Sequence, residues 1–248
     1  VTASQLVASG VILNTITGWG NGISFTVAAI VLILYTALGG YLAVTYTDWV
    51  QVGLLMLGVI LAVPFAANAI GGAGEIRTLP ESYFDVGAWG WPTIIAFALS
   101  TLLSFFTTMD SYTRCMAAKD ANTARKGGFI AALCILPIAL CATYEGLAAK
   151  VLIPDLPAGS NSLIQLILMT FPSGIKGLVI TGIFAAIMSS ADIAILTASA
   201  NVTRDIYQRY INPKASDKRI VRLGTISSLI IGCISLLFAW LNPDIMDI

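Results

Sequence analysis

The chain has 248 residues, of which 57% are hydrophobic and only 10% are charged, whereas a soluble domain carries about a quarter charged residues. Thirteen Lys and Arg residues balance thirteen Asp and Glu residues, so the sequence offers no basic surplus for binding nucleic acid. The absence of histidine excludes hydrolases that use a Ser-His or Cys-His pair. This composition predicts an all-α polytopic membrane protein that is not an enzyme.

Seven apolar segments follow one another along the chain, and a helix needs about 20 such residues to cross the bilayer. The first segment, residues 2–13, is short and counts as a partial span. The fourth is expected to continue as a polar helix to Lys119, and a short apolar stretch at 163–169 precedes the sixth. Six complete spans are predicted, at residues 23–42, 49–70, 91–108, 129–149, 175–200 and 223–240.

The chain begins inside an apolar stretch at Val1, and we expect it to be an internal piece of a longer protein. We further expect residues 1–248 to form a single transmembrane domain. Basic residues predict its orientation, because they are enriched in cytoplasmic loops. If the spans alternate, ten of the thirteen Lys and Arg residues lie on one side, in the predicted loops at 119–127 and 204–222 and next to them. The loop at 71–90 is then outside.

A first polar cluster lies at residues 39–51, at the turn expected between the second and third segments. Gly39 and Gly40 permit a tight turn, and Asp48 follows at the expected start of a helix. Two interpretations of Asp48 stay open. It caps the helix as an N-cap acceptor, or it is a carboxylate on the exit path of a cation.

A second polar cluster lies in the middle of the sixth predicted span. Ala186, Ser189 and Ser190 share one face of a helix, and Asp192 adds a charge near the middle of the membrane. Hydroxyl and carbonyl oxygens are the ligands that hard cations prefer. The alternative is that these small residues only allow two helices to pack closely. A third cluster, Ser104, Thr107 and Thr108, is predicted to line a cavity for a substrate.

Together, residues 35–51, 110–119 and 189–207 resemble motifs of the sodium:solute symporter family in order, in spacing and in side of the membrane. The resemblance covers nearly the whole chain. It implies a partial five-plus-five inverted-repeat core of the LeuT-like kind, in which broken helices hold substrate and ion near the midplane. The chain would then supply core helices three to nine of a transporter domain.

The resemblance also assigns residues to sites. It implies a sodium site at Ala186, Ser189 and Ser190, and a second cation site that includes Asp48. Family members with a second sodium carry hydroxyls just after the serine pair, where this chain has Asp192 and Ile193. Asp192 would then act as a ligand or carry a proton. Thr108 stands where sugar transporters carry an amide, which argues against a sugar as substrate.

These implications predict a multi-pass protein of the plasma or inner membrane that couples Na⁺ to the symport of a small organic solute. Its expected partners are therefore the solute, sodium and the lipid bilayer, with no nucleic acid. The alternative is a transporter-like input domain of a membrane histidine kinase, which uses the same fold as a sensor. An ion channel is disfavoured, since the sequence contains no filter-like loop.

Overall fold

The computed structural model describes residues 1–155 and 162–241, and this part of the chain is helical and contains no strand. The described residues form two compact units. The first unit contains Val1–Leu57 and the described residues from Ile180 onward, and the second contains Gly58–Val179. Two helices, α2 (Asn21–Ala69) and α7 (Ser173–Ala200), have residues in both units. The expectation of a single transmembrane domain stays a prediction.

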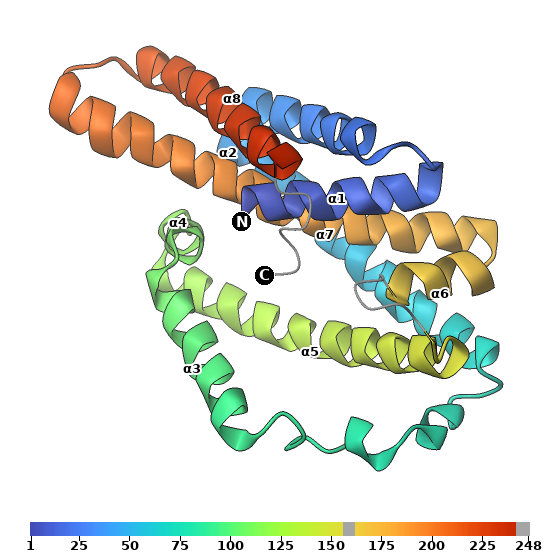
Figure 1. Ribbon diagram of the computed structural model, residues 1–248. Coiled ribbons are helices and arrows are strands. Elements are labelled where there is room, and N and C mark those ends of the chain that lie inside the picture. The colour runs from blue at the N-terminus through green and yellow to red at the C-terminus, as the bar shows by residue number, and fades with distance from the viewer. Residues whose placement is uncertain (156–161, 242–248) are drawn as a thin grey trace. The chain divides into compact units, whose positions relative to one another are not determined.

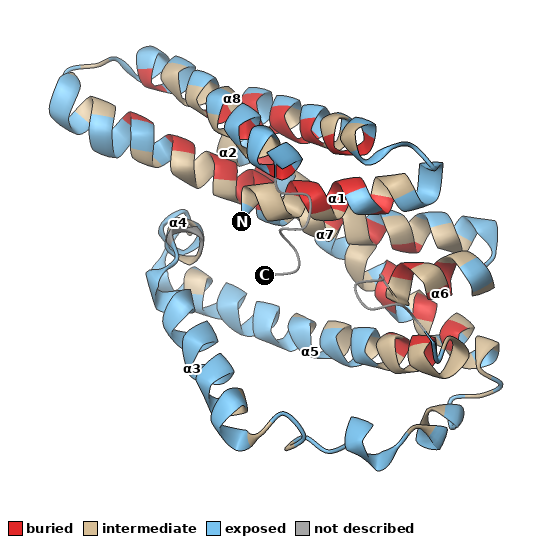
Figure 2. Ribbon diagram, in the orientation of Figure 1, coloured by how far each residue is buried: buried red, intermediate tan, exposed pale blue. Residues whose placement is uncertain are grey.

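The first unit packs α1 (Thr2–Thr17), the N-terminal part of α2 and most of α7 with α8 (Asp217–Leu241) around one apolar core. In Figure 1, α8 follows η3 (Asn201–Ile211), a π-helix that directly continues α7. The buried faces of these helices meet in the core (Figure 2). The core residues are Leu6, Val7, Phe25, Ala29, Leu32, Ile33, Ala191, Ile195 and Ala239.

The helix α2 is broken at Gly40, which has φ 62° and ψ −169°, a conformation open to glycine and strained for other residues. The sequence predicted two spans, 23–42 and 49–70, joined by a turn. The structure replaces that turn with a break at one residue, after which the helix resumes at once. The result is an element of 49 residues, more than twice the length needed to cross a bilayer.

The prediction of six complete spans therefore differs from the observed helices. Within the described residues, four helices are long and apolar enough to cross a membrane, and one of them is α2, which merges two predicted spans. The predicted span at 91–108 is α3 (Trp91–Thr107), an apolar helix that is shorter than the others. The four are Asn21–Ala69, Ala121–Leu152, Ser173–Ile211 and Asp217–Leu241.

The second unit is built on α5 (Ala121–Leu152) and α6 (Ser162–Thr170), which pack together near the end of α5. Its other elements are the last turns of α2, the 3₁₀ turns η1 (Glu75–Thr78) and η2 (Glu81–Tyr83), α3, α4 (Met109–Met116) and the first turns of α7. The predicted continuation of the fourth span is wrong, because Thr108 is extended at ψ 127° and separates α3 from α4. Most of the predicted loop at 119–127 is also helix.

The early start of α5 has a local cause. The Asp120 carboxylate accepts a hydrogen bond from the Thr123 backbone N–H at 2.6 Å, so Asp120 is the N-cap of α5. Hydrogen bonding to the charged form lowers the pKa of the Asp120 carboxyl below its usual value. The cap allows the polar residues 121–128 to form the first turns of the helix.

In each unit α2 and α7 approach each other closely at a glycine. In the first unit, a Cβ placed on Gly182 of α7 would lie 2.9 Å from the Leu54 carbonyl oxygen of α2. In the second unit, a Cβ on Gly58 of α2 would lie 3.2 Å from Cα of Val179 in α7. Small residues at such points let two helix backbones pack without side chains between them.

Candidate cation site in the first unit

A hydrogen bond in the interior of the first unit joins α2 to α7. The Tyr35 hydroxyl of α2 donates to a carboxylate oxygen of Asp192 in α7, two residues that lie 157 positions apart in the sequence. Asp192 is fully buried, and Tyr35 is half-buried. The side chains of Thr36 and Gln51, both on α2, lie beside the same phenol. A polar cluster therefore connects the two helices next to the apolar core.

The charge of this region is negative. In residues 1–57 and 180–203 the only charged side chains are Asp48 and Asp192, and no Lys, Arg or His occurs there. Removing a carboxylate from water is costly unless a cation or hydrogen-bond donors compensate it. These two segments of the sequence thus provide two carboxylates, one buried and one half-buried, and no cationic side chain.

The serine pair lies on the same helix, one turn before Asp192. The Ser189 hydroxyl donates to the Ala186 carbonyl at 3.0 Å, and the Ser190 hydroxyl reaches the same carbonyl at 3.2 Å. The structure therefore brings together the three predicted oxygens within one turn. Because each hydroxyl donates to the helix, its oxygen lone pairs point away from that bond and are suited to accept a cation. Residues 189 and 192 are three apart and share a face of α7.

The structure contradicts one of the two interpretations of Asp48. Asp48 lies inside α2, eight residues after the break at Gly40, and the residues between them are helical. It is therefore not an N-cap. Gln51, which lies beside the Tyr35 phenol, is three residues further on, so the two side chains share a helix face. Asp48 thus lies on the face of α2 that carries the polar cluster.

The three residues predicted to contact a substrate belong to the second unit. Thr107 donates to the Leu103 and Ser104 carbonyls at 3.2 Å each, and Thr108 donates to Ser104 at 2.8 Å. All three side chains are exposed at the end of α3, next to the break at Thr108. The side chain of Asp110, which belongs to the family motif, lies outside the described residues.

Two residues of interest were not predicted from the sequence. Tyr35 lay within a matched motif but had no assigned role, because a contact across 157 positions leaves no local pattern. Glu145 of α5 is fully buried, and neither carboxylate oxygen has a hydrogen-bond partner among the described residues. Its signal was present in the sequence, since it is the only charged residue in the predicted span 129–149.

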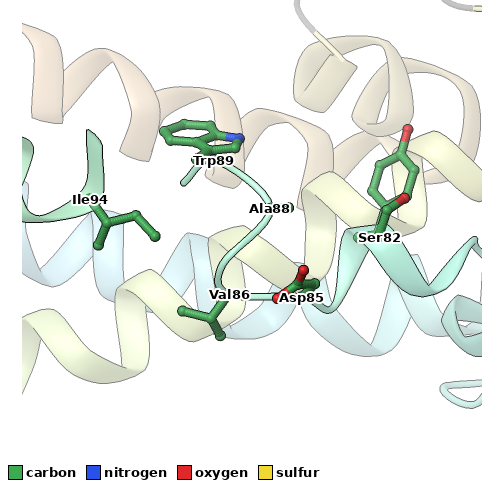
Figure 3. A pocket seen from close by; sticks show the side chains of 7 residues that line it. Ser82, Asp85, Val86, Ala88, Trp89 and Ile94 are labelled. Carbon is green, nitrogen blue, oxygen red and sulfur yellow. The ribbon is translucent and has the colours of Figure 1, made fainter. Parts of the chain in front are cut away.

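A further hollow lies elsewhere, at the loop between α2 and α3 and the first turn of α3. It has a volume of about 600 Å³ and is lined by Asp85, Trp89 and Ile94 among others. In Figure 3, the Trp89 and Ile94 side chains lie to the left and the Asp85 side chain to the right. The Gly87 N–H donates to the Asp85 carboxylate at 2.8 Å, which is a local turn contact. None of the predicted site residues lines this hollow.

Comparison with known proteins decides the family. A family model described as "Sodium:solute symporter family" matches residues 1–247. The chain belongs to the sodium:solute symporter family. Its relatives include the high-affinity proline transporter PutP of Bacillus subtilis, 30% identical over 96% of this chain, and the sodium/pantothenate symporter of Haemophilus influenzae, 27% identical over 92%. The sodium/myo-inositol cotransporter 2 of Oryctolagus cuniculus is 26% identical over 83%.

The fold is similar to that of a solved symporter. A Na⁺-coupled sialic acid symporter in a substrate-bound outward-open state matches with a TM-score of 0.79 and 24% identity, over 98% of this chain and 56% of the other. This likeness confirms the predicted LeuT-like fold class. The chain spans about half the length of its bacterial relatives, 52% for the proline transporter and 49% for the pantothenate symporter, and 36% of the inositol cotransporter. The family and these relatives are transporters rather than enzymes, and the protein is a multi-pass membrane protein.

Proposed function

We propose that the protein acts in sodium-coupled symport of a small organic solute across the plasma or inner membrane. The observation that carries this proposal is the oxygen cluster of the first unit, in a family whose relatives include sodium symporters. The two buried or half-buried aspartates, with no basic residue in the same segments, add the negative charge that a cation requires.

Two cation positions are proposed within that cluster. The Ala186 carbonyl with the Ser189 and Ser190 hydroxyls supplies ligands for one Na⁺, and Asp48 and Asp192 contribute to a second cation site. Solute contacts are proposed for Ser104, Thr107 and Thr108. The Thr107 and Thr108 hydroxyls donate to carbonyls of their own helix, as the hydroxyls of the serine pair do, and their lone pairs stay available to a solute donor.

The test uses the full-length protein in proteoliposomes, with uptake of proline, pantothenate, myo-inositol and sialic acid measured with and without a sodium gradient. The Ser189→Ala/Ser190→Ala variant is expected to need at least about tenfold more sodium for half-maximal uptake, since one lost ligand costs on the order of 1.4 kcal/mol. Unchanged sodium dependence would reject the first site. Ser199→Ala is the matched control, because this serine of α7 donates to the Gly224 carbonyl of α8 instead.

Asp48 is tested separately by Asp48→Asn, which preserves the shape and removes the charge. We expect a marked loss of sodium-driven uptake while the amount of protein in the membrane stays nearly unchanged. Wild-type uptake with wild-type sodium dependence would show that the carboxylate charge has no part in transport.

A further inference from the structure

The first turns of α8 form a basic hollow. Its volume is about 460 Å³, and three cationic side chains, Lys218, Arg219 and Arg222, line it together with Ser216 and Leu223. The three basic residues are exposed, and the lining includes no acidic side chain. Arginine presents several N–H donors in a planar fork that matches the oxygens of a phosphate. The chemistry of the hollow is therefore that of a phosphate site.

The position of this hollow along α8 is also specific. All charged residues of α8 lie between Asp217 and Arg222, and residues 223–241 contain none. That uncharged stretch has about the length that crosses a bilayer. Leu223 is therefore the point at which the helix enters the hydrocarbon, and the basic side chains lie at the level of the lipid headgroups. This holds whichever side of the membrane the end of α8 faces.

The neighbouring π-helix supports one of the arginines. The elements η3 and α8 pack side by side, as Figure 1 shows. The guanidinium of Arg219 lies 5.7 Å from the centre of the Tyr207 ring of η3. A cation over an aromatic face is attracted by the ring, so Tyr207 restricts where Arg219 reaches.

We propose that this hollow binds the phosphate of an acidic phospholipid, with the acyl chains along the apolar part of α8. A lipid is favoured over a soluble phosphate because the basic groups adjoin an uncharged, membrane-length stretch. The proposal is separate from sodium coupling, since it involves none of the residues proposed to bind cation or solute. Basic side chains at a membrane surface attract anionic lipids in general, and the claim here is that these three form a site.

The test measures the thermal unfolding midpoint of the detergent-purified full-length protein during titration with phosphatidylglycerol, since a ligand that binds the folded state raises the midpoint. Phosphatidylcholine and inorganic phosphate serve as separate titrants. In the Arg219→Gln/Arg222→Gln variant, the phosphatidylglycerol concentration for half of the shift is expected to rise on the order of tenfold. The matched control, Arg204→Gln/Arg209→Gln, removes the same charge from η3 and is expected to stay within about twofold of the wild type.

Equal weakening in both double variants would overturn the proposal, because it would indicate diffuse surface charge rather than a site. A shift with inorganic phosphate as large as that with phosphatidylglycerol would overturn the lipid assignment. If the glutamine variant does not fold, Arg219→Lys/Arg222→Lys retains the charge and removes the planar fork. Weaker phosphatidylglycerol binding in this lysine variant supports the site, and wild-type binding contradicts it.

Discussion

The contact between Tyr35 and Asp192 bears on both the stability of the first unit and its proposed cation site. A fully buried carboxyl group is accommodated in the first unit because the Tyr35 hydroxyl donates to it, and the side chains of Thr36 and Gln51 lie beside that phenol. The same carboxylate lies one turn from the serine pair. The bond thus fixes one oxygen of a buried carboxyl group within one turn of the proposed cation ligands.

Replacing Tyr35 by Phe removes this donor and leaves the ring in place. Loss of one partner of a buried polar group costs about 1–3 kcal/mol, so the free energy of unfolding should fall by this amount. We also expect the sodium concentration for half-maximal uptake to change, because Asp192 loses its orientation. Both are measured on the full-length protein. Tyr46→Phe on the exposed side of the same helix is the control, and identical behaviour of the two variants would contradict the role of Tyr35.

Glu145 presents the opposite case, a buried carboxyl group without a hydrogen-bond partner among the described residues. A buried polar group that lacks a partner destabilises the fold by about 1–3 kcal/mol. Glu145→Leu is therefore expected to raise the free energy of unfolding by this amount, while uptake falls if the carboxyl group serves transport. Thermal unfolding and uptake of the full-length protein provide the two measurements. A clear loss of stability would show that Glu145 has a stabilising partner in the complete protein.

At the scale of elements, helix breaks rather than loops are the features that position the site. The break at Gly40 allows α2 to present Tyr35 before it and Asp48 after it within one continuous element. The break at Thr108 likewise divides α3 from α4. Each break occupies one residue, so the chain changes direction without a polar loop.

The variant Gly40→Ala tests whether the helix break requires glycine. Because φ 62° with ψ −169° is essentially restricted to glycine, alanine is expected to lower the free energy of unfolding by about 1–3 kcal/mol. Gly53→Ala, on the same helix at a place where a Cβ meets no neighbour, should cause no loss. Denaturant or thermal unfolding of the purified full-length protein distinguishes the two variants. Equal stability of Gly40→Ala and Gly53→Ala would show that the backbone conformation at residue 40 does not require glycine.

The apolar segments predicted most of the helices, because hydrophobicity along the chain is a local property. Their boundaries were less predictable. A glycine pair is compatible with both a turn and a helix break, and only tertiary packing decides between them. The serine face of α7 followed directly from helical spacing, whereas the Tyr35–Asp192 contact did not, since it joins distant segments. Asp48 was ambiguous as long as the start of its helix was unknown.

At the scale of the whole molecule, the distribution of Lys and Arg predicts the orientation in the membrane. In a variant without the four native cysteines, Asp217→Cys should be protected from an impermeant thiol reagent on intact cells. Ser82→Cys should be labelled. Both positions are exposed in the structure, so accessibility reports the side of the membrane. Labelling of residue 217 from outside would contradict the orientation.

Gly58 and Gly182 limit how this protein can diverge in evolution. A side chain at either position meets backbone atoms of the facing helix, which have no flexible end that can move aside. A substitution at Gly182 requires α2 and α7 to move apart in the first unit, where the Tyr35–Asp192 contact joins the same two helices. A substitution at Gly58 requires the backbone of the second unit to shift by a few tenths of an ångström. We therefore expect glycine to be favoured at these two positions because of backbone geometry rather than side-chain chemistry. At Gly53 a Cβ meets no neighbour, so this geometric constraint is absent there.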